Sequence, residues 1–148
     1  MTRRGIRHDR RGAAAMEFAL IVVPLFMLVF GTIEFGRLLW TRDVVKQVAS
    51  DGARCMGVLA EGCSSSDRVY SETRAKDYIV ARAVGFSVPL TVAGVTLDHA
   101  AGCASPEGQG TSSEVTVEFT FNSAVGPIVE ALAESRLLRV QSCFANQV

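Results

Sequence analysis

The sequence predicts an α+β protein in which a long N-terminal transmembrane helix continues into a domain with a small antiparallel sheet of about three strands. Three observations predict this fold. Ala13–Ile33 carries one ionisable residue in 21 positions, a helix-face pattern continues to about Leu59, and the C-terminal third alternates apolar and polar residues with the period of a strand. We therefore divide the chain into a basic leader (1–12), a transmembrane helix (13–33) and an exported domain (34–148).

The leader is strongly basic although the chain as a whole is neutral. It holds five arginines against one aspartate, a net charge of +4, and the rest of the chain carries the compensating −4. A basic segment beside an apolar run stays on the cytoplasmic side of a membrane. A nucleic-acid-binding arm is the weaker interpretation, because the leader has no aromatic residue and adjoins a run of membrane length. We expect one membrane span, a cytoplasmic N-terminus and no nucleic-acid partner.

The apolar run has the length of a membrane-spanning helix. Its 21 residues would extend about 31 Å, which matches the hydrocarbon core of a bilayer. Pro24 lies inside it, and membrane helices tolerate proline better than soluble ones. A removable signal peptide is the alternative, but Val29-Phe30-Gly31 is a poor cleavage site and helix-compatible residues continue to Trp40. The sequence therefore favours a retained anchor.

Glu17 is the ionisable residue of this run. A carboxylate is unfavourable by roughly 2–3 kcal/mol at the centre of a membrane and by less near its surface, so a position close to the headgroups is the simpler explanation. However, two arginines, Gly12, four small or apolar residues and Glu17 also have the layout of a prepilin processing site, which is cut after the glycine. Cleavage would free the amine of Ala13. The Glu17 carboxylate of a neighbouring subunit could then pair with this amine and fix the register between packed helices.

The segments Gly12–Leu20 and Phe30–Arg37, with Pro24 between them, resemble the N-terminal module of TadE-like proteins, which are pseudopilins of the tight-adherence (Tad/Flp) pilus system. The resemblance covers about residues 11–54. It implies a minor pilin of the bacterial inner membrane with a periplasmic, pilin-like domain and a structural, non-enzymatic role. Its implied partners are a prepilin peptidase that cuts after Gly12, other pilin or pseudopilin subunits, and the Tad assembly platform. Ala13 departs from the aromatic residue that often follows the cut in type IV pilins.

A second function remains open on the sequence alone. The chain could be an uncleaved, signal-anchored periplasmic binding or scaffold protein in which Gly12 stays intact and no filament is entered. The mass of the mature chain distinguishes the two functions, because only the pilin loses its leader.

The helix predicted beyond the membrane presents one continuous face. Small residues at the centre of this face favour a covering sheet, with a neighbouring helix as the alternative. Trp40 is expected either to anchor at the membrane surface or to pack in the core. The face consists of Phe35, Leu38, Arg42, Val45, Ala49, Gly52, Met56 and Leu59.

The remaining elements follow from periodicity and turn residues. Gly62–Asp67 is predicted as a loop, and a second helix spans Ser71–Val84 with Ser71 as a possible N-cap. Gly94 is a possible bulge in the first strand. The predicted strands are Val88–Leu97, Glu114–Asn122 and Leu137–Phe144, with a loop over Ala100–Ser113 and a short helix over Ile128–Ala133.

Four cysteines lie beyond the span, at Cys55, Cys63, Cys103 and Cys143. Their spacings contain no C-x-x-C, so two disulfides in an oxidising compartment are favoured over a metal site. Three pairings are possible. We favour Cys63–Cys103 with Cys55–Cys143, since Cys63 and Cys103 both fall in predicted loops. Cys55–Cys63 with Cys103–Cys143 stays open, because Cys143 alternates onto the polar face of its strand.

The sequence contains no phosphate-binding loop, zinc signature or nucleophile motif. His99, with Asp98 and Cys103 nearby, is the one cluster that a catalytic interpretation could use, and a loop histidine beside a disulfide is the simpler explanation. We therefore expect neither an enzyme nor a cofactor, metal or small-molecule substrate.

Overall fold

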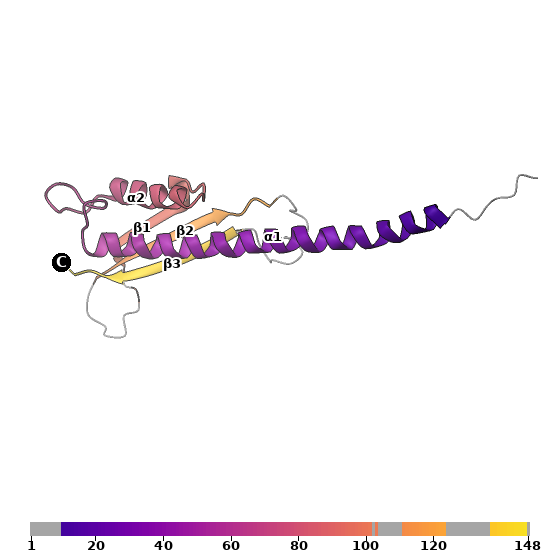
Figure 1. Ribbon diagram of the computed structural model, residues 1–148. Coiled ribbons are helices and arrows are strands. Elements are labelled where there is room, and N and C mark those ends of the chain that lie inside the picture. Colours follow the sequence, from indigo (N-terminus) through magenta and orange to yellow (C-terminus); the bar gives the residue numbers. More distant parts are fainter. Residues whose placement is uncertain (1–9, 102, 104–110, 124–136, 148) are drawn as a thin grey trace, which may run out of the picture. The chain divides into compact units, whose positions relative to one another are not determined.

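The computed structural model describes residues 10–101, 103, 111–123 and 137–147 and confirms the α+β class (Figure 1). The chain divides into two compact units, residues 1–36 and 37–148, and the first helix contributes to both. The short helix expected over Ile128–Ala133 lies outside the described residues. The elements are α1 (Arg10–Gly57), α2 (Glu72–Gly85), the 3-10 helix η1 (Val92–Gly94), β1 (Val95–Ala101), β2 (Ser112–Thr120) and β3 (Leu137–Ala145).

Helix α1 is continuous through Pro24 and ends in a specific backbone motif. The amide of Ala60 donates to the Cys55 carbonyl at 3.0 Å and the amide of Leu59 donates to the Met56 carbonyl at 3.2 Å. Leu59 has a φ of 50°, so it occupies the left-handed position of a Schellman C-cap that glycine normally fills. The helix therefore stops before Leu59, whereas the sequence pattern had placed Leu59 on the helix face.

The predicted apolar face of α1 is correct at its centre and wrong at its N-terminal end. Val45, Ala49 and Met56 are buried, whereas Phe35 is 59% exposed and Arg42 is also exposed. Periodicity reports which residues share a face of a helix, but not how far along the helix a partner covers that face.

Helix α2 begins and ends close to the predicted positions. Ser71 has an extended backbone at the N-cap but makes no side-chain capping hydrogen bond. Ala75, Ile79 and Ala83 form the buried face of the helix. The amides of Phe86 and Val88 both donate to the Ala83 carbonyl, and they close the last turn.

The three strands form one antiparallel sheet in the order β1-β2-β3. Strands β2 and β3 pair without interruption from Ser112↔Ala145 to Thr120↔Leu137, which confirms two of the predicted strands to within two residues at each end. Strand β3 alternates between exposed residues, including Cys143, and partly buried residues. The polar-face position expected for Cys143 is therefore confirmed.

The first predicted strand is wrong over Val88–Gly94. Val88 and Leu90 are buried there, but they belong to a connection that leads into η1, with Pro89 between them. Buried residues at a spacing of two also occur in a packed connection, so the pattern did not distinguish it from a strand. Gly94 is not a bulge. A Cβ atom there would lie 2.5 Å from the Glu118 carbonyl oxygen, so Gly94 permits close approach to β2.

The bulge lies instead near the end of β1, in residues expected to form a loop. Asp98 pairs with Glu114 and Ala101 with Ser112, so two residues of β1 face one residue of β2. The Asp98 carboxylate accepts a hydrogen bond at 2.9 Å from the Ala100 amide inside this bulge.

The core of the second unit joins α1, α2 and the sheet (Figure 1). A Cβ atom on Gly52 would lie 2.6 Å from Ile79 Cδ1 on α2 and 3.5 Å from Val115 Cγ2 on β2. The small residues of α1 therefore face both the sheet and a neighbouring helix, which were the two alternatives. Trp40 is 62% exposed, so the alternative that placed it in the core is wrong.

Candidate functional site

The predicted processing residues lie near the N-terminal end of α1. Gly12 and Ala13 are helical and exposed. A Cβ atom built on Gly12 meets no atom within 4 Å, so packing within the described residues does not require glycine at this position.

Glu17 lies one helical turn beyond Ala13 on the same helix. Four residues correspond to about 6 Å along the axis and return to the same face, so the Glu17 side chain and the Ala13 backbone are neighbours on the helix surface. Glu17 is exposed in the isolated chain. A carboxylate in this position can be reached by a cationic group from another subunit.

The surface around Glu17 is apolar on every side of the helix. Large apolar side chains from Met16 to Ile33 are between 42% and 70% exposed, apart from the partly buried Val22. Covering such side chains gains about 1.5–3 kcal/mol each, so a dozen of them represent on the order of 20 kcal/mol, more than a small domain's whole stability. This segment must be covered by lipid or by other protein.

Length and hydropathy make a bilayer a suitable cover. Among the described residues one helix is long and apolar enough to cross a membrane, with a mean hydropathy of 2.4 over 18 residues, none of which is buried. A cleavable signal sequence can pass the same test.

The disulfides differ from the pairing that the sequence favoured. Cys55 is joined to Cys63, and Cys103 is joined to Cys143, which is the pairing left open. The Schellman cap at the end of α1 turns the chain back on itself, so Cys63 reaches Cys55 after only eight residues. Cys143 points to the exposed face of β3, away from the α1 cysteine that we had expected to join it.

The second disulfide lies beside Glu114. The Sγ atom of Cys103 is 3.6 Å from Glu114 Oε2, and Gln141 Nε2 donates to Glu114 Oε1 at 2.6 Å. Cys103, Glu114 and Cys143 are close enough together to suggest a metal site. Both cysteine sulfurs are consumed by the disulfide, however, so they offer no thiolate to a metal ion.

His99 lies in the bulge of β1 and not in a loop, and it contacts a buried serine. Asn146 Nδ2 donates to the His99 carbonyl at 2.9 Å and to Thr111 Oγ1 at 3.1 Å. The Oδ1 atom of Asn146 therefore faces Ser113, whose hydroxyl donates to it at 2.6 Å. Since a hydroxyl has one proton, Ser113 accepts from His99 Nδ1, 2.9 Å away.

This arrangement is the reverse of a nucleophilic pair, in which the imidazole accepts the serine proton. Ser113 is 0% exposed, so no substrate reaches it. The network ties the C-terminal segment to the bulge and has a structural role.

Tyr70 packs against the same histidine. Its ring stacks on the ring of His99, with 4.4 Å between ring centroids. Burial and the negative charges of Glu72 and Asp98 raise the pKa of Tyr70, so the phenol stays neutral.

Sequence reasoning missed this network and also missed a cavity lined by Arg68 and Arg74. No motif marked either one. Asn146 is 33 residues from Ser113 and 47 from His99, and the left-handed backbone of Arg68 is set by the fold of its loop.

The described residues define a protein with one candidate membrane helix that continues into a small α+β domain cross-linked by two disulfides. A family model described as TadE-like protein matches residues 12–54. This match confirms the resemblance and contains Gly12, Ala13 and Glu17. Over these residues the chain is similar to TadE-like proteins, and with the apolar helix the match suggests a single-pass membrane protein. No curated protein and no solved structure matches the chain.

Proposed function

We propose that this protein is a minor pilin, or pseudopilin, that helps to assemble a Tad/Flp-type pilus after a prepilin peptidase has cut it between Gly12 and Ala13. The observation that carries the proposal is the TadE-like match over residues 12–54, which begins at the glycine before the proposed cut. The exposed apolar surface of α1 supports it, because such a surface suits both a bilayer and the packed helices of a filament.

The proposed topology places the N-terminus in the cytoplasm and the second unit in the periplasm, with the apolar helix in the inner membrane. The net charge of +4 in residues 1–12 supports this orientation. The two disulfides of the second unit support it as well, since disulfides persist in the periplasm and are rare in the cytosol.

Cleavage can be tested with a substitution that the fold tolerates. We expect Gly12→Glu to leave α1 intact, because the position is open and glycine is a poor helix former. The variant should accumulate as a precursor that still carries residues 1–12, whereas the unaltered chain should begin at Ala13. Intact mass spectrometry of the protein from membranes of its native host measures the difference.

Gly31→Ala is the matched control, because a Cβ at Gly31 also meets no atom within 4 Å in the same helix. It should be processed normally. An unaltered chain that keeps its leader in a host with an active prepilin peptidase contradicts the proposal. That result would leave the alternative function, an uncleaved periplasmic binding or scaffold protein.

The role of Glu17 needs a separate test. We expect Glu17→Ala to be inserted and cleaved normally but to lose incorporation into the pilus or its base, because the Ala13 amine of a neighbour would lack its counter-charge near hydrocarbon. Glu17→Gln keeps the shape of the side chain and should fail equally, whereas Glu17→Asp keeps the charge and should retain part of the function. Co-fractionation with sheared pili and membrane complexes measures incorporation. Normal incorporation of the glutamine variant would refute the pairing.

A further inference from the structure

Large apolar side chains are exposed mainly at one end of the second unit. From Arg37 onward, seven such side chains are exposed among the described residues. Five of them lie near the point where α1 enters this unit and are between 44% and 62% exposed: Leu39, Trp40, Val84, Val92 and Leu137. Exposed apolar side chains that gather in one region of a surface mark a site of contact with protein or lipid.

Pairing and packing bring these residues to the same end of the unit. A cavity of about 120 Å³ joins the start of the second unit on α1 to the segment after α2 and to the last part of β2. Thr120 pairs with Leu137, and Gly94 of η1 approaches Glu118. In Figure 1 the end of α2, the end of β2 and the start of β3 lie at the same end of the second unit. We call this region the entry end; it consists of residues 37–41, 84–92, 119–122 and 137.

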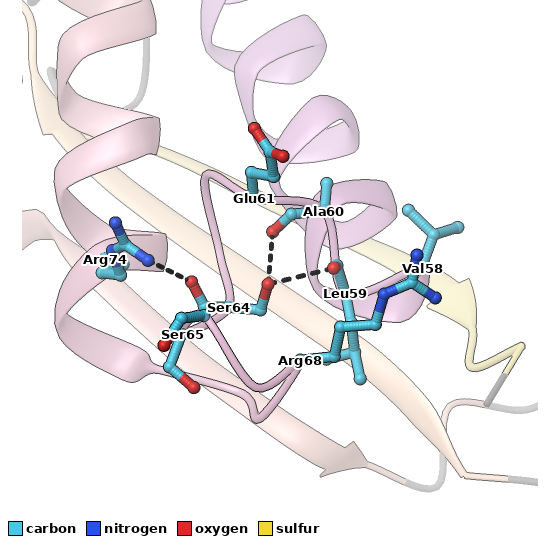
Figure 2. A pocket seen from close by; sticks show the side chains of 9 residues that line it. Val58, Leu59, Ala60, Glu61, Ser64, Ser65, Arg68 and Arg74 are labelled. Atoms are coloured by element: carbon cyan, nitrogen blue, oxygen red, sulfur yellow. Dashed lines mark hydrogen bonds between the residues drawn. The ribbon is translucent and has the colours of Figure 1, made fainter.

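The opposite end of the second unit is more polar. There α1 ends at Gly57, where a Cβ atom would lie 2.6 Å from Phe144 Cδ1 on β3. The loop that follows has two exposed valines, Val58 and Val69. Polar and charged side chains surround a cavity beside this loop, and Figure 2 shows Glu61, Ser64, Ser65, Arg68 and Arg74 there. The exposure of large apolar side chains is therefore a feature of the entry end and not of the whole unit.

The position of the entry end in the chain keeps it close to the membrane. Arg37 follows Ile33, the last residue of the predicted span, by four residues. Four residues extend at most about 14 Å even when fully stretched, so the second unit begins within that distance of the end of the span. Tryptophan is enriched at this level of a membrane protein, and Trp40 is exposed at the entry end. A bilayer surface is thus within reach of the entry end in every copy of the chain.

The entry end carries a single charged residue, Arg37. The nearest acid before it on α1, Glu34, is 7% exposed and so does not present its carboxylate at the surface. Glu118, just outside the entry end, pairs with Arg139 at 3.4 Å. A surface with several apolar side chains, one cation and no acid suits the headgroup region of a membrane that contains anionic lipids.

The cavity of the entry end suits one phosphate group. Its volume is below the range of about 300–1,000 Å³ that is usual for whole ligands, and Arg37, Ser87 and Asn122 contribute polar side chains to its lining. The guanidinium carbon of Arg37 lies 5.9 Å from the centroid of the buried Phe121 ring, which supports it. Because a guanidinium has five N–H donors, Arg37 can bind a phosphate in addition to its contacts within the chain.

We propose that the entry end of the second unit lies on the surface of a membrane that contains anionic phospholipids. The exposed apolar side chains of the entry end insert among the headgroups, and a lipid phosphate binds at Arg37. This inference rests on the proposed membrane topology but not on cleavage at Gly12. The second unit is then held in one orientation on the membrane by its own contacts, and not by the chain connection alone.

The test uses the full-length protein in nanodiscs of phosphatidylcholine and phosphatidylglycerol. A trace of lipid with a nitroxide on its headgroup broadens the NMR signals of nearby backbone amides. We expect strong broadening at Ser87 and Leu137, which are far from the span in sequence. Broadening at Val58 and Val69, at the opposite end, should be weak.

A pair of valine substitutions separates docking from simple tethering. Val84→Ser with Val92→Ser should lose most of the broadening at Ser87 and Leu137, because it removes apolar contacts with lipid. Both side chains are exposed, so the midpoint of thermal unfolding should not change. Val58→Ser with Val69→Ser is the matched control and should keep the broadening. A second unit that is only tethered would show the same broadening in both variants, and that result would overturn the proposal.

The role of Arg37 is tested by changing the charge of the lipid. In the unaltered protein, phosphatidylglycerol should increase the broadening above its level in phosphatidylcholine alone, and sodium chloride should reverse the increase. Arg37→Gln should lose this increase. Arg54→Gln, which changes an exposed arginine near the other end of α1, is the matched control and should keep it. Equal effects of the two substitutions would reduce the result to net charge and contradict binding at Arg37.

The same samples distinguish failure of this inference from failure of the proposed topology. A full-length protein that does not enter nanodiscs contradicts the membrane span, and this inference with it. A protein that enters the nanodiscs but shows no loss of broadening in the variant with Val84→Ser and Val92→Ser contradicts docking alone.

Discussion

Gly94 shows how one missing methyl group sets the distance between two elements. A Cβ atom at this position would lie 2.5 Å from the backbone carbonyl oxygen of Glu118 and 3.4 Å from Leu90 Cδ1. The first of these atoms belongs to β2, which is held by its pairing with β3, so it cannot move aside as the end of a side chain can.

We therefore expect Gly94→Ala to lower the free energy of unfolding by about 1–3 kcal/mol, the usual cost of overpacking. Urea denaturation followed by circular dichroism measures the change. Gly85→Ala is the control, because no atom lies within 4 Å of a Cβ there, and it should leave stability unchanged or slightly raised. Equal stability of the two variants would show that η1 can move away from β2.

Residues with a chemical signature can be proposed as site residues from the sequence, whereas residues marked only by their neighbours in space cannot. Gly12 and Glu17 stood out because a glycine and a carboxylate are conspicuous at the edge of an apolar run. Ser113 gave no such signal. It was predicted as the last residue of a loop, and its hydrogen bonds to His99 and Asn146 exist only after the bulge and the C-terminal segment have come together.

At the scale of elements, the spacing of apolar residues predicted a helix or strand correctly where one packing partner covers the element along its whole length. Strands β2 and β3 were predicted almost completely, because apolar and polar residues alternate in both sequences, although only β3 also alternates in exposure. It failed over Val88–Gly94, where a packed connection has the same spacing of buried residues as a strand. The disulfide pairing that we favoured was wrong for a related reason. Which cysteines meet depends on the turn after α1, and the left-handed Leu59 that makes this turn carries no glycine signal.

The two disulfides should differ in their response to reduction. Cys55 is 6% and Cys63 0% exposed, whereas Cys143 lies on the exposed face of β3. A thiol reductant must reach a sulfur atom, so we expect mild reduction of the folded protein to open Cys103–Cys143 first. Alkylation followed by peptide mapping identifies the opened pair.

Reduction in urea provides the control, because both pairs should then open together once burial is lost. Opening of Cys55–Cys63 first in the folded protein would contradict the described burial.

The long loop closed by Cys103–Cys143 also matters for stability. Its 40-residue separation corresponds to a loop-closure term of about 4 kcal/mol, against about 2.5 kcal/mol for the eight residues between Cys55 and Cys63.

At the scale of the whole molecule, the two units place opposite demands on their surroundings. Residues 1–36 contain the apolar helix surface and no buried core of their own among the large apolar side chains described there. Residues 37–148 contain the buried cluster formed by α1, α2 and the sheet, together with both disulfides. One unit depends on lipid or other subunits, and the other carries the interactions that a soluble domain needs.

A chain that begins at Arg37 should therefore fold without detergent. We expect it to be soluble and monomeric, with both disulfides formed and a cooperative unfolding transition, because the apolar residues of its core are supplied from within residues 37–148. Size-exclusion chromatography with light scattering measures the mass, and thermal circular dichroism measures the transition. The matched control begins at Ala13 and keeps the apolar helix, so it should require detergent to remain monomeric. Aggregation of the shorter chain would show that residues 13–36 of α1 contribute to the stability of the second unit.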